Sequence, residues 1–236
     1  MRILYVFPHP DDESFGPARA IAAQVRGEHS VFLLTLTRGG ATKLRHALGY
    51  SIDQMGDVRY EEMQCVAGVL GLTDLTVHDL PDGGLKELDP REIEDTVRRH
   101  VEKVRPTVVV TYPVHGISGF HDHLATHAVV KRVFLELRDS GAEYLKRLAF
   151  VTLTEEQAAI ASGVHRLSGS SPDEIDCLTR ATDEDMNAFR RALDCYITYR
   201  KMIEETGVRD SLDPLCAFEV FGEDHDPPLD DLTSGL

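Results

Sequence analysis

The sequence predicts an α/β fold, in which helices cover both faces of a mostly parallel sheet and a C-terminal elaboration follows. Short apolar runs alternate with helical stretches up to about Thr154. These runs show no alternation of apolar and polar residues, which is typical of strands buried on both faces. A chain of 236 residues can bury such a sheet without needing disulfide bonds.

Each expected strand is an apolar run bounded by turn or loop residues. The strands are expected at residues 2–7, 30–36, 75–80, 107–112 and 148–153. The helices between them carry typical terminal residues, with Asp57 and Asp89 as N-caps and Gly27 and Gly71 after the last turns. These helices are expected at residues 17–26, 57–70, 90–104 and 123–137. Strand–helix alternation of this kind indicates a Rossmann-like sheet, with the common strand order 3-2-1-4-5.

The segment after Thr154 is predicted to be an irregular elaboration of this core. A short helix and a loop rich in Ser and Gly precede a strand near residues 176–178. A long helix over 182–205 begins at the capping-box-like sequence Thr182-Asp183-Glu184-Asp185. A last strand is expected at 218–221.

We expect one domain over residues 1–236, because the sequence contains neither a repeat nor a linker. It divides into a core at 1–154, the elaboration at 155–225 and a tail at 226–236. The tail holds two Pro and three Asp and is expected to be mobile.

Composition excludes several classes of partner. The chain has 25 Lys and Arg against 40 Asp and Glu, a formal net charge of −15. This charge argues against binding nucleic acid or an anionic membrane surface, and no apolar run is long enough for a membrane span. No export signal is recognisable, so the expectation is a cytoplasmic protein with reduced, buried cysteines. The cysteines are Cys65, Cys177, Cys195 and Cys216.

An acidic loop directly after the first strand predicts a metal site. Its sequence is Pro8-His9-Pro10-Asp11-Asp12-Glu13. Loops at the carboxyl ends of parallel strands handle ligands, and so much negative charge in one tight loop favours a bound cation. His9 and Asp12 offer nitrogen and carboxylate oxygen, a combination that suits Zn²⁺ or another divalent first-row metal.

The loop after the fourth strand should supply a third ligand, because the first and fourth strands are neighbours in the expected order. This loop contains three histidines, and a fourth lies one helical turn further on; they are His115, His121, His123 and His127. We choose His123 as the ligand and His121 as the next candidate. A pair formed by His123 and His127 stays open, although it lacks the Glu of the His-Glu-x-x-His pattern. His115 is expected to have no role.

These motifs resemble the LmbE-like, PIG-L-type family of metal-dependent N-deacetylases. The family signature [AP]-His-Pro-Asp-Asp-Glu is similar to Pro8–Glu13, and the resemblance covers about residues 1–150. Weaker matches are found at Thr37–Gly40, Arg59–Glu62, Leu70–Leu72, Leu80–Asp82 and Asp122-His123. The chain departs from the family at one place, where Phe120-His121-Asp122-His123 replaces the usual His-Pro-Asp-His.

The resemblance implies a role for each matching residue. His9, Asp12 and His123 would be zinc ligands, and Asp11 the general base. Arg59 and Asp82 would contact the substrate sugar, although Arg59 could instead pair with Glu62 on a helix surface and Asp82 could be a turn residue. Phe120 stands where the family has an acid histidine, so we expect His121 to serve as the acid. Asp122 would orient an imidazole, and Glu13 would fix the loop.

The leading functional hypothesis is therefore a hydrolase that removes an N-acyl group, most simply N-acetyl, from a small amino-sugar conjugate. A metal-binding regulatory protein without catalysis and a metal-dependent phosphoesterase are the alternatives. A dinucleotide-binding module is excluded because the three carboxylates would repel a pyrophosphate and no glycine-rich loop is present. The sequence leaves the oligomeric state open, including a homo-oligomer.

Overall fold

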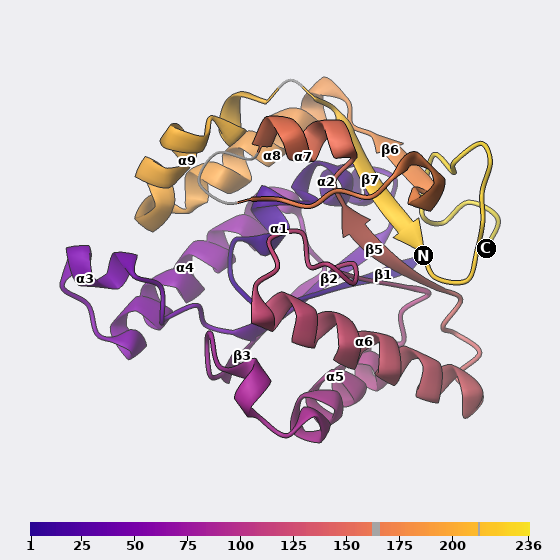
Figure 1. Cartoon of the computed structure of the whole chain (residues 1–236), viewed down its shortest axis with the longest axis horizontal. Coiled ribbons are helices and arrows are strands. Elements are labelled where there is room, and N and C mark those ends of the chain that lie inside the picture. The colour runs from indigo at the N-terminus through magenta and orange to yellow at the C-terminus, as the bar shows by residue number, and fades with distance from the viewer. Residues whose placement is uncertain (162–165, 212) are drawn as a thin grey trace.

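A single seven-stranded sheet runs through the computed structural model, which describes residues 1–161, 166–211 and 213–236. The strand order is β3-β2-β1-β4-β5-β7-β6 (Figure 1). The first five strands are parallel, and β7 is antiparallel to both β5 and β6. The strands are β1 (Arg2–Phe7), β2 (Ser30–Thr37), β3 (Asp74–Leu80), β4 (Val108–Thr111), β5 (Arg147–Thr152), β6 (Cys177–Arg180) and β7 (Leu215–Val220).

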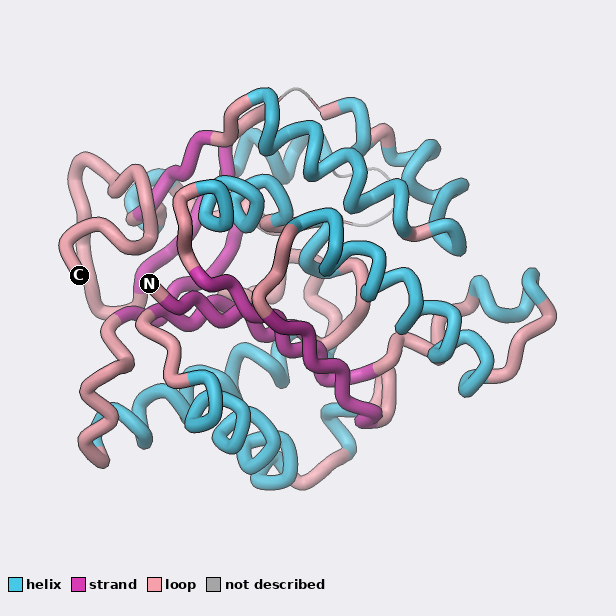
Figure 2. The backbone as a smooth tube through the Cα atoms, turned by 180° about the vertical axis from the view of Figure 1, so that it is seen from behind, coloured by secondary structure: helices cyan, strands magenta, loops and turns pink. Residues whose placement is uncertain are grey.

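Helices cover both faces of the sheet, as Figures 1 and 2 show from opposite sides. One face packs against α2, α4 and α8, and the other against α5 and α6. In β1, Ile3 and Tyr5 point to the first face while Leu4 and Val6 point to the second, so the strand is buried on both. The helices are α1 (Asp12–Phe15), α2 (Ala18–Arg26), α3 (Leu44–Leu48), α4 (Ile52–Leu70), α5 (Pro90–Val104), α6 (His121–Asp139), α7 (Glu155–Ala161), α8 (Asp183–Cys195) and α9 (Arg200–Thr206).

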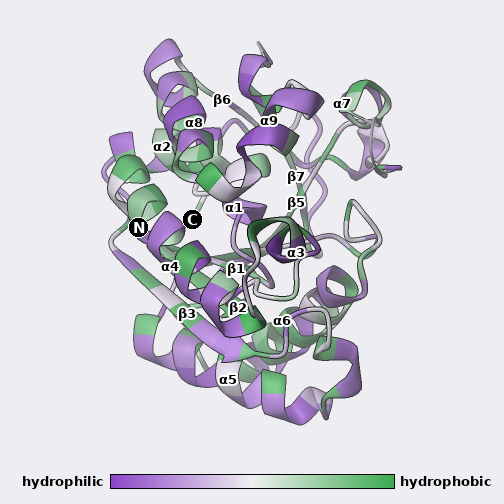
Figure 3. Ribbon diagram, turned by 90° about the vertical axis from the view of Figure 1, so that its left-hand side faces the viewer, coloured by the Kyte–Doolittle hydropathy of each residue, from purple (hydrophilic) through white to green (hydrophobic). Residues whose placement is uncertain are grey.

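The outward sides of these helices are polar, which matches the acidic composition. Figure 3 shows hydrophilic residues predominating along α5 and α8, while the buried side of α8 packs against α2 and α4. No helix in the described parts of the chain is both long and apolar enough to cross a bilayer.

The predicted α/β class and the strand order 3-2-1-4-5 are confirmed. The helix predicted to start at Asp57 instead starts at Ile52, because Ser51 and Gln54 form a complete capping box. Part of residues 37–56, to which the sequence assigned neither a strand nor a helix, forms α3, which projects from the body (Figure 1).

One prediction for the C-terminal part is wrong. The single helix expected over 182–205 ends at Cys195, and after the short 3₁₀ turn Ile197–Tyr199 the separate helix α9 begins. The tail at 226–236 packs against the sheet, and its mobility stays a prediction. Leu232 in this tail is fully buried, and its carbonyl accepts a hydrogen bond from Arg147.

The expectation of four reduced cysteines is also wrong, because Cys65 and Cys195 form a disulfide. They lie 130 residues apart in the sequence, but the packing of α4 against α8 brings their Cα atoms to 5.8 Å, which is within the range of disulfides. Cys177 and Cys216 are free and buried, as expected.

Candidate metal centre

The candidate site lies where the carboxyl ends of β1 and β4 meet. Since β1 pairs with β2 on one side and β4 on the other, the two loops that follow β1 and β4 face each other across the edge of the sheet. The first of these loops turns sharply at Asp11, whose φ of 85° lies in the left-handed region. This turn starts α1 and leaves Asp12 buried at the first helical position.

His9, Asp12 and His123 come together, and their potential ligand atoms all lie within 4.8 Å of one another. His9 Nδ1 is 3.6 Å from Asp12 Oδ2, and His123 Nε2 is 3.4 Å from Asp12 Oδ1. Asp12 is held in place independently, because its carboxylate accepts hydrogen bonds from the His9 amide at 2.9 Å and the Tyr112 hydroxyl at 2.7 Å. The arrangement offers two imidazole nitrogens and one carboxylate, the donor set of a three-ligand catalytic metal site.

The outward ring nitrogens of both histidines have partners that assign their tautomers. His9 Nε2 lies 3.1 Å from Asp122 Oδ2, and His123 Nδ1 lies 2.9 Å from the Gly116 carbonyl. Because both partners accept hydrogen bonds, each of these ring nitrogens carries a proton, so the nitrogens that face Asp12, His9 Nδ1 and His123 Nε2, are the ones that would bind a metal.

Gly116 must be glycine for this geometry. Its φ is 63°, and a Cβ atom added there would lie 2.9 Å from the His123 Cβ. A larger residue would therefore push His123 away from Asp12.

Asp122 lies at the centre of a second group of polar contacts beside His9. Its carboxylate accepts hydrogen bonds from the Gly83 amide at 2.8 Å and the Leu85 amide at 3.1 Å, in addition to His9. Burial acts to raise the pKa of Asp122, but the hydrogen bonds from His9 and these amides outweigh it and lower the pKa. Asp82 Oδ1 lies 3.4 Å from His9 Nε2, so Asp82 also faces the site.

The field around His9 favours positive charge. Burial alone would lower the pKa of His9, but Asp122, Asp12, Asp82 and Asp11 together raise it to about 9. Without a metal the site thus recruits a proton to offset its carboxylates. A divalent cation between His9, Asp12 and His123 would meet the same electrostatic need, so the residues present fit a metal.

Asp11 lies beside Asp12 and is held by a different partner. Arg59 donates hydrogen bonds from Nη2 to Asp11 Oδ2 at 2.8 Å and to the Pro10 carbonyl at 2.7 Å. Burial raises the pKa of Asp11 to about 6 against the opposing effect of the Arg59 charge. The carboxylate therefore has the proton affinity that a general base needs near neutral pH.

Arg59 does not lie on a helix surface. It is 1% exposed, and its guanidinium stacks over the Tyr199 ring at 4.2 Å. The alternative pairing with Glu62 is wrong, because Glu62 instead accepts hydrogen bonds from the backbone amide and hydroxyl of Thr198. Glu13 is fully buried and accepts hydrogen bonds from Ser14 and Tyr196, consistent with a role in fixing the loop.

Three of the four histidines near β4, namely His115, His121 and His127, fall outside the candidate metal clusters of the described residues. His121 is exposed at the first residue of α6, and Phe120 before it packs edge-on against His123 at 5.5 Å between ring centroids. His127 is buried and bonded through Nδ1 to the Tyr112 carbonyl. Among the described residues, the candidate metal clusters include neither His121 nor His127.

Two tyrosines that were not singled out from the sequence take part in the site. Tyr112 stacks flat on His123, with centroids 4.1 Å apart and an 8° angle between the rings, besides its bond to Asp12. Tyr112 ends the expected strand that precedes the histidine loop, and this position could have identified it from the sequence as a candidate site residue. Tyr196 contacts the acidic loop from 185 residues away, and no local pattern marks it.

Comparison with known proteins gives consistent matches. Residues 4–134 match the family model described as PIG-L: GlcNAc-PI de-N-acetylase. A 1D-myo-inositol 2-acetamido-2-deoxy-alpha-D-glucopyranoside deacetylase of Kineococcus radiotolerans is 29% identical over 168 residues, covering 60% of this chain and 46% of that protein. The N-acetylglucosaminyl-phosphatidylinositol de-N-acetylase of Bos taurus is 31% identical over 140 residues, covering 57% of this chain and 51% of that protein.

The chain thus spans about half the length of these relatives. Among solved structures, a deacetylase triple mutant from teicoplanin biosynthesis superposes with a TM-score of 0.72. The superposition covers 93% of this chain and 98% of that one at 17% sequence identity. At such low identity the likeness shows the shared fold alone.

Proposed function

The chain belongs to the PIG-L family, and on that premise we propose that it is a metal-dependent hydrolase that removes an N-acyl group, most simply N-acetyl, from an amino-sugar conjugate. The observation that carries the proposal is the pairing of two adjacent carboxylates with different environments. Asp12 faces His9 Nδ1 and His123 Nε2, whereas Asp11 faces Arg59 and has a raised pKa. Such a division supports one carboxylate as a ligand and its neighbour as a base.

His9, Asp12 and His123 would hold the metal, and Zn²⁺ is the ion that this donor set suits best. When bound, a divalent ion supplies Lewis-acid character and makes water more acidic. Asp122 and the Gly116 carbonyl keep the two imidazoles in the tautomers that leave a lone pair toward the ion.

Asp11 is the proposed general base. Its carboxylate takes the proton from the water that attacks the amide carbonyl, and Arg59 keeps that carboxylate beside Asp12. The family resemblance implies that Arg59 contacts the sugar, but its burial supports the role of holding Asp11 instead. Asp82 remains the candidate for a sugar contact, because it lines the site beside His9.

His121 is the proposed proton donor to the departing amine, since an amide nitrogen leaves only when protonated and an imidazolium can supply that proton. It is exposed at the start of α6, two residues before His123. Phe120, packed on His123, occupies the position that the family gives to the acid histidine.

The alternative of a metal-binding protein without catalysis rests on this same Phe120. Turnover separates the two functions. The purified chain, loaded with Zn²⁺, should release a free amine from an N-acetylglucosaminide, detected with an amine-reactive dye, and Asp11→Asn should abolish most of this signal. Absence of turnover with Zn²⁺ and with other first-row divalent ions, over a panel of N-acyl amino sugars, would reject the enzyme and favour the alternative.

Location and oligomeric state stay predictions. The Cys65–Cys195 disulfide argues against the predicted cytoplasmic location, because disulfides persist mainly in oxidising compartments.

A further inference from the structure

Tyr196 connects the C-terminal part of the chain to the acidic loop. It follows α8 directly and is 1% exposed. Its hydroxyl accepts a hydrogen bond from the Asp11 amide at 2.7 Å and donates one to Glu13 Oε1 at 2.7 Å. One buried oxygen atom therefore contacts the residues on both sides of Asp12.

The bond to the Asp11 amide matters because of the conformation of Asp11. A φ of 85° is unusual for a residue with a Cβ atom, and such backbone persists only where surrounding contacts hold it. The direction of the Asp11 carboxylate follows from this backbone. Arg59 holds the carboxylate end of the residue, and Tyr196 holds its amide end.

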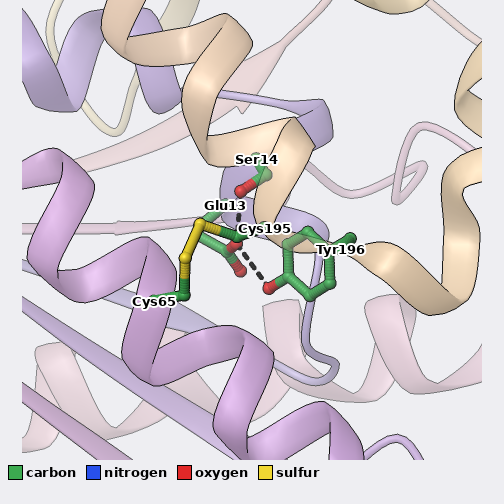
Figure 4. Close-up of a disulfide and its surroundings, with 5 residues drawn as sticks. All are labelled: Glu13, Ser14, Cys65, Cys195 and Tyr196. Atoms are coloured by element: carbon green, nitrogen blue, oxygen red, sulfur yellow. Dashed lines mark hydrogen bonds between the residues drawn. A yellow bond between two sulfur atoms is a disulfide. The ribbon is translucent and has the colours of Figure 1, made fainter.

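Tyr196 is itself fastened to α4. The preceding residue, Cys195, is bonded to Cys65 of α4, as Figure 4 shows together with the hydrogen bond from Tyr196 to Glu13. Two residues further on, Thr198 donates hydrogen bonds to Glu62 of α4 through its amide at 2.7 Å and its hydroxyl at 2.8 Å. Helix α4 also carries Arg59, so both contacts that hold Asp11 are anchored on one helix.

We propose that Tyr196 is a positioning residue for Asp11 in the reaction, and that the Cys65–Cys195 disulfide braces it against α4. The proposal rests on the proposed function, in which Asp11 is the base. It assigns a role in the reaction to a residue outside the stretch 4–134 that matches the family.

The first test is Tyr196→Phe, which removes only the hydroxyl. We expect kcat to fall by about 10- to 100-fold, because small misplacements of a catalytic group have effects of this size. KM and metal content should stay unchanged, since Asp12 keeps its own bonds to the His9 amide and Tyr112. Amide hydrogen exchange of residues 8–14, followed by mass spectrometry, should become faster because the Asp11 amide loses its acceptor.

Tyr5→Phe is the matched control. Tyr5 is also fully buried, and its hydroxyl donates a single hydrogen bond to Gln24, within the core. Its loss should lower stability without changing kcat or exchange in residues 8–14. Unchanged kcat in Tyr196→Phe, or a fall matched by loss of metal or by the control, would overturn the positioning role.

A second experiment tests the role of the Cys65–Cys195 disulfide. It also tests the proposal if Tyr196→Phe does not fold. Reduction by a dithiol transfers two electrons and two protons to the Cys65–Cys195 bond, giving two thiols and the cyclic disulfide of the reagent. Reduction should lower kcat and speed exchange in residues 8–14, in the same direction as Tyr196→Phe but to a smaller extent. The double variant Cys65→Ser/Cys195→Ser should start at the reduced level and not respond to the dithiol.

Measuring both kcat and hydrogen exchange distinguishes failure of this proposal from failure of the proposed function. If wild-type protein turns over no N-acyl substrate, the proposed function fails whatever the exchange shows. If the wild type is active but neither experiment changes kcat, the proposed function stands and the role of Tyr196 is rejected.

Discussion

Replacing Asp122 by Asn should weaken metal binding, although Asp122 is not one of the three proposed ligands. In the native protein Oδ2 accepts hydrogen bonds from His9 Nε2 and the Gly83 amide, while Oδ1 accepts one from the Leu85 amide. All three partners act as donors. An asparagine offers only one acceptor oxygen, so its NH₂ group must face at least one of them.

Either orientation of the amide has a cost. If NH₂ points to Leu85, a buried amide loses its acceptor, at about 1–3 kcal/mol. If NH₂ points to His9, the imidazole must flip its tautomer, and the proton moves to the Nδ1 atom that faces Asp12. Since about 1.4 kcal/mol is a factor of ten, we expect the metal Kd to rise about 10- to 100-fold, the range typical of residues that orient ligands.

The assay is competition for Zn²⁺ between metal-free protein and a chromophoric chelator of known affinity. Asp185→Asn is the matched control, because Asp185 is equally buried and accepts a backbone hydrogen bond from Thr182, but contacts Arg26 instead of His9. It should lose stability and keep its metal affinity. A Kd within a factor of two of the wild type in Asp122→Asn would show that metal binding does not depend on the Asp122 carboxylate.

Four further predictions concern single side chains. His123→Ala should lose the bound metal by elemental analysis, and full occupancy would show that another histidine is the ligand. Asp11→Asn should keep the metal but lower kcat by roughly 10²–10⁴, and near-normal turnover would exclude it as the base. His121→Ala should flatten the alkaline limb of the kcat/KM pH profile with metal intact; an unaltered profile would remove it as the acid. Burial and the charge of Lys103 lower the pKa of His100 to about 4, so from pH 6.5 down to 4 the unfolded chain takes up the proton first and stability should fall by roughly 2–3 kcal/mol. Urea unfolding of His100→Gln should show a smaller decrease, and an equal one would contradict this.

The sequence predicted the parts of the site that depend on local signals. His9 and Asp12 directly follow one apolar strand, and His123 follows another, so the strand order alone was enough to bring them together. Burial on both faces produced uniform apolar runs that could be recognised as strands of a parallel sheet. The choice of His123 over His127 agrees with the cluster that the structure forms, while the roles of these residues stay predictions.

Local sequence signals gave wrong helix boundaries at two places. Asp57 and Ser51 are both good N-cap residues, but only Ser51 has Gln54 at the position that completes a capping box, so α4 begins a turn and a half earlier than expected. Between α8 and α9 the sequence has neither Gly nor Pro, and a continuous helix was the natural prediction. The break comes from tertiary contacts, chiefly the hydrogen bonds from Thr198 to Glu62.

What could not be predicted is the dependence of the site on the far end of the chain. Tyr196 and Asp11 are 185 residues apart, and Cys65 and Cys195 are 130 apart. Contacts at such separations depend on how α8 packs against α4, which no short pattern encodes. The stretch that matches the family carries the proposed ligands and base, whereas the elaboration fixes the backbone from which that base projects. Substitutions in the elaboration should therefore alter turnover more than metal binding, because among the described residues the side-chain partners of Asp12 and His123 lie in the core.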